Sequence, residues 1–120
     1  MGCTLPNPEP LTYVTLSQLK TTTMEKYALL ARVEAKAGKE NDVENFLKSA
    51  LALANEEAET VAWYALKIGP STFGIFDTFN AEEGREAHLA GKIAAALMEH
   101  APDMLASPPV IEKVDIIAVK

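Results

Sequence analysis

Hydrophobic residues along this chain follow two different periods, and the changes between them divide the chain into predicted elements. Residues 26–35, KYALLARVEA, alternate between two faces, which predicts a strand with one apolar and one mixed face. After Gly38, apolar residues recur three and four positions apart, which predicts an amphipathic helix that ends near Ala58. The apolar stripe of this helix consists of Val43, Phe46, Leu47, Ala50, Leu51 and Ala54.

A hairpin and a second helix are expected next. Residues 60–68 and 72–79 are rich in β-branched and aromatic side chains, and a Gly-Pro-Ser turn at 69–71 joins them. Asn80 and Glu83 have the spacing of a capping box, so the second helix is expected to start near Ala81. One stripe of this helix carries small residues and an imidazole: Gly84, Ala87, His88, Gly91 and Ala95.

The complete order predicts an α+β fold of the ferredoxin-like type. A proline-containing connector begins at Pro102, and residues 110–119 form the last predicted strand, which gives the order β-α-β-β-α-β. This order predicts a four-stranded antiparallel sheet with helices on one face only. Because Trp63 and Tyr64 are adjacent, they point to opposite faces, so both faces of the sheet are apolar. We therefore expect a twofold homodimer that packs sheet on sheet.

Residues 1–24 differ in composition from the rest of the chain. They contain three of the seven prolines and a threonine-rich segment, so we expect a partly flexible N-terminal arm ahead of one domain at 25–120. Two alternatives stay open, since Met24 is a candidate natural start and residues 11–16 are a candidate edge strand. Cys3, the single cysteine, has no internal disulfide partner.

The charge excludes some classes of partner. The formal net charge is −6 and the eleven Lys and Arg residues are dispersed, which disfavours nucleic acid and anionic membranes. No stretch approaches eighteen apolar residues and no secretory signal is recognisable, so we expect a cytoplasmic protein. His88 and His100 lack the spacing of metal ligands, and no glycine-rich phosphate loop occurs. We expect neither a metal nor a nucleotide cofactor.

His88 and Asp77 are the candidate polar groups of a site. An imidazole titrates near neutrality and suits a proton acceptor, but His88 also fits a core histidine bonded to a backbone carbonyl, and both interpretations stay open. Asp77 lies within an apolar strand and must be paired, hydrogen-bonded or protonated there. It is placed to orient His88 or Arg85, and the sequence does not decide which face it occupies.

Aromatic strand residues are the candidate walls of a pocket. Trp63 and Phe76 suit offset stacking on a flat ligand, although aromatic residues in strands are usually core. Tyr64 suits either a hydroxyl that orients a substrate oxygen or a dimer contact.

The segment VAWYALKIGPSTFGIFDTFNAEEGREAHLAGKIAAAL and the final IEKVDIIAVK resemble the antibiotic biosynthesis monooxygenase family, over residues 26–120. The resemblance implies a small dimeric α+β barrel of a family that includes cofactor-independent quinol and polyketide oxygenases. It also implies that Trp63 and His88 lie near the pocket between sheet and helices. Haem-degrading barrels of this kind use an Asn on the first strand, and this first strand has none, which argues against haem cleavage.

The function expected from the resemblance is oxidation of a quinol or other hydroxyaromatic by molecular oxygen. His88 would accept the hydroxyl proton, and Trp63, Phe76, Tyr64 and Asp77 would bind the substrate. The alternatives are a dimer that binds an aromatic ligand without catalysis, and a purely structural dimer with a filled pocket beside His88.

Overall fold

The computed structural model describes residues 25–120, so the expected arm, the candidate strand at 11–16, Cys3 and Met24 lie outside the described residues. Four strands form one antiparallel sheet with the spatial order β2-β3-β1-β4. The strands are β1 (Tyr27–Glu34), β2 (Thr60–Lys67), β3 (Thr72–Phe79) and β4 (Val110–Asp115). The predicted ferredoxin-like fold is confirmed.

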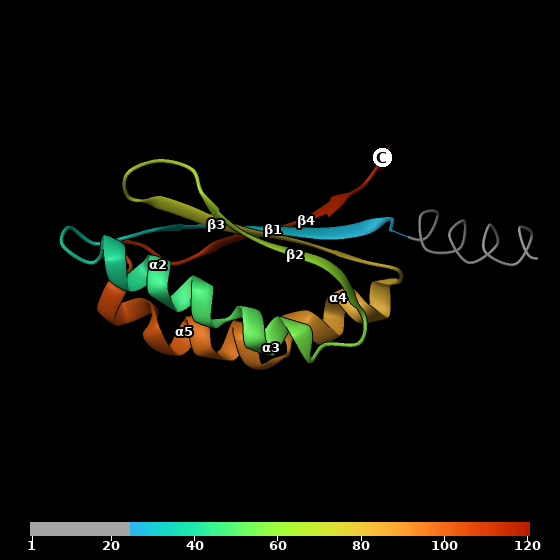
Figure 1. Ribbon diagram of the computed structural model, residues 1–120, viewed down its shortest axis with the longest axis horizontal. Helices are drawn as coiled ribbons and strands as arrows, with labels where there is room; N and C mark the ends of the chain where they lie inside the picture. The colour runs from blue at the N-terminus through green and yellow to red at the C-terminus, as the bar shows by residue number, and fades with distance from the viewer. Residues whose placement is uncertain (1–24) are drawn as a thin grey trace, which may run out of the picture.

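All described helices lie on one side of the sheet (Figure 1). They are α2 (Glu40–Ser49), α3 (Leu51–Asn55), α4 (Glu82–Leu89) and α5 (Lys92–Met104). We call this side of the sheet the helix-facing side and the opposite side the open face. The core lies between the helix-facing side and the helices, and its buried members include Val33, Val43, Leu47, Phe73, Ile75, Ile93 and Leu97.

The helix boundaries differ from the sequence prediction in three ways. The first predicted helix is divided at Ala50 into α2 and α3, and the second is divided after Leu89, because Gly91 has an extended backbone and precedes α5. The prediction of a capping box at Asn80 and Glu83 was wrong, since Ala81 is the N-cap of α4 and makes no side-chain cap bond. The extended backbone of Ala81 moves the helix start one residue beyond the position that Asn80 would cap.

The ends of α5 and β4 also differ from the prediction. Helix α5 continues past Pro102 to Met104, which is buried. Proline removes one backbone donor, but burial of Met104 in the core favours continuing the helix. The last strand ends at Asp115 rather than at residue 119.

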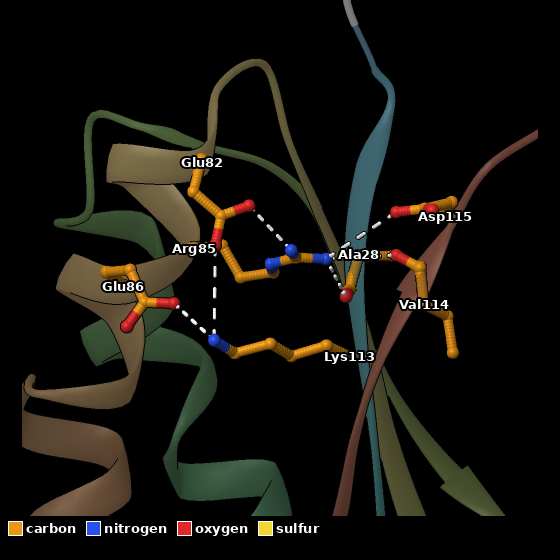
Figure 2. Close-up of polar contacts among 7 residues, drawn as sticks. All are labelled: Ala28, Glu82, Arg85, Glu86, Lys113, Val114 and Asp115. Atoms are coloured by element: carbon orange, nitrogen blue, oxygen red, sulfur yellow. Dashed lines mark hydrogen bonds and ion pairs between the residues drawn. The ribbon is translucent and has the colours of Figure 1, made fainter.

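Arg85 fixes α4 to the edge of the sheet (Figure 2). Its Nη1 donates to the carbonyl oxygens of Ala28 at 3.3 Å and Val114 at 3.1 Å, and its Nη2 donates to Glu82 Oε1 at 2.6 Å. Hydrogen bonds from a buried cation to carbonyls on β1 and β4 hold α4 at a set height above both strands. His88 lies one turn further along the same helix, so this anchor also positions His88.

No described helix covers the open face of the sheet (Figure 1). On it, Tyr64 is 55% exposed and stacks on Phe76, with ring centroids 6.5 Å apart. Further apolar residues lie around this pair on the neighbouring strands: Leu30, Leu66, Val110 and Val114. The centre of this face is therefore apolar, with Arg32 and Glu112 beside it in the register, and none of the described helices covers it.

We expect Gly74→Ala to destabilise the protein by about 1–3 kcal/mol. A Cβ atom at Gly74 would lie 2.9 Å from the carbonyl oxygen of Ala31 on the paired strand, and backbone cannot move aside cheaply. Gly69→Ala is the control, because a Cβ there meets only ordinary contacts, the nearest at 3.9 Å. Urea denaturation measures both, and equal stability of the two variants would contradict the close packing of β1 on β3.

Candidate functional site

Asp77 lies on the helix-facing side of β3, at the centre of the sheet. Alternation along the strand turns Asp77 toward the helices together with Ile75 and Phe79, and turns Phe76 to the open face. The side chain of Asp77 is almost completely buried, with 1% exposure. A carboxylate so far from water requires a partner, and His88 on α4 supplies it.

The imidazole of His88 lies between two carboxylates. Its Nδ1 is 2.7 Å from Oε1 of Glu57, in the connection between α3 and β2, and its Nε2 is 2.8 Å from Oδ2 of Asp77. Thr60 Oγ1 donates to the same Glu57 oxygen at 2.8 Å. The contact with Asp77 has an ion-pair distance but not the alignment of a hydrogen bond, so both Asp77 oxygens lack a hydrogen-bond partner among the described residues.

The two carboxylates change the acidity of His88. Burial by itself lowers the pKa of His88, but the contacts and charges of Asp77 and then Glu57 together raise it by more, so the pKa lies above its ordinary value of 6.5. The imidazolium form of His88 is therefore favoured more strongly than that of a free imidazole. Neutral His88 is correspondingly a stronger base than a free imidazole.

A cavity lies on each side of His88. The inner cavity, of about 30 Å³, lies between the sheet and α5, and Asp77 and His88 are its polar wall. Its apolar wall consists of Leu29, Ala31, Ile75, Leu89, Ile93, Ala94, Leu97 and Ile111. The outer pocket, of about 400 Å³, is lined by the α3–β2 connection with Glu56, Glu57 and Glu59, and by α4 and the start of α5. The inner cavity is large enough for a water molecule or a hydroxyl group and too small for an aromatic ring.

The predicted site residues divide between the two faces of the sheet. Trp63 pairs directly with Asp77 in the β2–β3 register, so it shares the helix-facing side with Asp77 and His88. The Trp63 indole Nε1 is buried and has no hydrogen-bond partner within residues 25–120. Tyr64 and Phe76 meet each other on the open face and do not reach His88.

Sequence reasoning did not find Glu57. This residue lies in the last turn of the helix that was predicted to end near Ala58, and it is separated from His88 by 31 positions, so local patterns carry no sign of the contact. Asp77 contacts His88, whereas Arg85 pairs with Glu82.

The described residues contain no group of three or more His, Cys, Asp or Glu side chains arranged to hold a metal ion. At His88, the two carboxylates bind opposite ring nitrogens and so do not converge on one point. None of the described helices is long and apolar enough to span a bilayer.

Several solved structures are similar to this protein, but no family model or curated protein is. A solved structure provisionally named an antibiotic biosynthesis monooxygenase, from Nitrosomonas europaea, is 12% identical with a TM-score of 0.69, and the match covers 79% of this chain and 93% of that one. Another with the same provisional name, from Chloroflexus aurantiacus, is 12% identical with a TM-score of 0.62, covering 79% of this chain and 96% of its own. These distant structures establish a shared fold.

A much more similar structure is that of a protein of unknown function from Nitrosomonas europaea. It is 60% identical to this chain, with a TM-score of 0.79, and the match covers 81% of this chain and 94% of that one. At this identity and coverage the chain belongs to the same family as that protein of unknown function from Nitrosomonas europaea.

Proposed function

We propose that this protein is a cofactor-independent monooxygenase that oxidises a quinol or other hydroxyaromatic with molecular oxygen. The observation that carries the proposal is the buried Asp77–His88 pair, which forms the polar wall of an otherwise apolar cavity. The fold shared with structures provisionally named antibiotic biosynthesis monooxygenases supports the same class of reaction.

The reaction needs a base and a dry site, because the substrate itself supplies the electrons. A hydroquinone and one O₂ give a hydroxyquinone and one water, so no external reductant is required. Removal of the hydroxyl proton raises the electron density of the ring and allows it to react with oxygen. The proton then returns to the oxygen atom that leaves as water. Apolar walls protect the anion from competing protonation.

The proton acceptor in this proposal is His88, reached through Asp77. A substrate hydroxyl donates to the carboxylate of Asp77, whose oxygens have no hydrogen-bond donor among the described residues, and the proton is taken up by the Asp77–His88 pair as an imidazolium facing a carboxylate. The base form is neutral His88, and it is populated only as the pH rises through the raised pKa of His88. We therefore expect kcat/KM to increase with pH and then level off, with an apparent pKa above 6.5 for the increase.

The substrate ring occupies an enlarged inner cavity in this proposal. Ile111 lines the cavity from the edge strand β4 and is 41% exposed, so its side chain is free to move outward when a ring enters. Trp63 lies beside Asp77 in the register but lines neither cavity in this structure. In this proposal it contacts the ring once the cavity enlarges, and its N–H, which has no acceptor among the described residues, donates to a substrate oxygen.

The second candidate function is a dimer that binds an aromatic ligand without catalysis. It is favoured by the carboxylates of Glu57 and Asp77, which occupy both ring nitrogens of His88 and leave neither free to contact a substrate directly. A binding protein needs only the hydrogen bonds of the site and tolerates His88→Gln with a modest loss of affinity.

Oxygen uptake by metal-free protein, against a panel of hydroquinones and polyphenols and corrected for spontaneous oxidation, tests the proposal. We expect saturable uptake that falls by about 100-fold or more in His88→Gln. His100→Gln is the matched control, because this exposed histidine lies in neither cavity beside His88. Uptake equal to the blank throughout the panel, with measurable ligand binding, would favour the binding dimer. Equal oxygen uptake by wild type and His88→Gln would contradict the role of His88 as the proton acceptor.

The homodimer is proposed to form through the open face of the sheet, with Tyr64 and Phe76 in its interface. Sedimentation of the full chain at micromolar concentration is expected to give the mass of two chains. Tyr64→Glu places a charge within the apolar centre of this face and should shift the protein toward the monomer. Met98→Glu is the control, because Met98 is equally exposed on α5, on the helix side. A folded monomer of the wild type at this concentration would contradict the sheet-on-sheet dimer.

A further inference from the structure

Glu57 holds the nitrogen of His88 that faces away from Asp77. Its Oε1 lies 2.7 Å from Nδ1 with the geometry of a hydrogen bond, whereas the Asp77 contact at Nε2 has only the distance. The Glu57 side chain is 22% exposed and lines the outer pocket, while Asp77 lines the inner cavity. The two carboxylates therefore occupy different surroundings on opposite sides of one ring.

The position of Glu57 is fixed by hydrogen bonds of its backbone and its side chain. Its backbone N–H donates to the carbonyl of Ala54 at 3.1 Å, and its own carbonyl accepts from the N–H of Thr60 at 3.3 Å. The Thr60 hydroxyl holds the Glu57 carboxylate at 2.8 Å. Gly84 lets α4 approach this connection, because a Cβ atom there would lie only 3.0 Å from the Glu59 carboxylate and 3.1 Å from its Cβ.

We propose that Glu57 is a positioning residue for His88: it binds the Nδ1 proton, so that Nε2 is the nitrogen that exchanges a proton with Asp77. The catalytic consequence rests on the oxygenase function proposed above, whereas the location of the proton is testable without it. A neutral imidazole has one N–H, and a carboxylate at Nδ1 determines which nitrogen carries it.

The proton transfer is balanced within this arrangement. A proton from the substrate hydroxyl passes to a carboxylate oxygen of Asp77 and from Oδ2 to Nε2, which leaves a substrate anion, an ionised Asp77 and an imidazolium. The Nδ1–H bond to Glu57 is kept throughout, so Glu57 neither gains nor loses a proton. Its negative charge stabilises the imidazolium that forms, as the orienting carboxylate of a catalytic triad does.

Within residues 25–120, two carboxylates contact the His88 ring, and the other charged groups near it do not. Asp77 faces it from β3 and Glu57 from the α3–β2 connection. Lys92, at the start of α5, and two further glutamates line the outer pocket without a contact to the ring. Arg85 on α4 is directed to Glu82 and to the sheet edge. Among the carboxylates that line the outer pocket, Glu57 is therefore the one whose removal should affect His88.

Nitrogen-detected NMR of histidine side chains in the full-length protein tests this inference, with His100→Gln used to assign the two imidazoles. We expect Glu57→Gln to lower the pKa of His88 while the neutral ring keeps its proton on Nδ1, because the amide oxygen still accepts that bond. Glu57→Ala should also release the preference for Nδ1. Glu56→Gln is the matched control, since it removes a charge from the same pocket without touching the ring, and it should leave both properties unchanged.

The pKa of His88 and the position of its ring proton decide the test. An unchanged pKa in Glu57→Gln, or a neutral wild-type ring protonated on Nε2, would overturn the inference whatever the activity. Glu57→Asp, which shortens the side chain and keeps its charge, should give an intermediate pKa and provides a second folded variant. If oxygen uptake occurs, its pH profile should move to lower pH in Glu57→Gln by the same amount as the pKa. A shifted pKa without any uptake would support the role of Glu57 and count against the oxygenase alone.

Discussion

The structure depends on one constraint, the neutralisation of a buried carboxylate in the middle of the sheet. Asp77 is 1% exposed, and an ionised carboxylate without water is stable only beside a positive group or hydrogen-bond donors. His88 meets this need only if α4 lies at the right height, which the bonds of Arg85 to β1 and β4 determine. The small residue at Gly84 and the carboxylate of Glu57 complete the arrangement from the α3–β2 connection.

Because Asp77 and His88 meet on the helix-facing side, the two faces of the sheet differ in character. The helix-facing side carries the polar pair, the inner cavity and Trp63, and it is closed enough to exclude bulk water from Asp77. The open face carries the stacked Tyr64 and Phe76 at its apolar centre, with Arg32 and Glu112 beside them in the register. In our proposal chemistry belongs to the first face and dimerisation to the second, so a partner chain affects the site by supporting the sheet.

Alternation and helical spacing in the sequence were enough to predict the strands, their order and the fold. They also indicated His88 and Asp77 as polar groups among apolar neighbours, because each is conspicuous within its own element. Phe76 and Asp77 are adjacent in β3 and must face opposite sides of a sheet, so the strand period already separates them. The helix break at Ala50 and the Glu57–His88 contact depend on tertiary packing, and no local residue pattern marks either of them.

A double-mutant cycle tests the central claim that Asp77 and His88 stabilise each other. The free energy of unfolding is measured for wild type, Asp77→Asn, His88→Gln and the double variant at about pH 5.5 and about pH 9. Because the folded-state pKa of His88 is raised, its contribution is fully present below the unfolded value of 6.5 and is lost as the pH rises through the folded value. We expect a coupling energy of about 0.5–3 kcal/mol at the lower pH that becomes smaller at the higher pH. Additive effects of the two substitutions at both pH values would contradict the account.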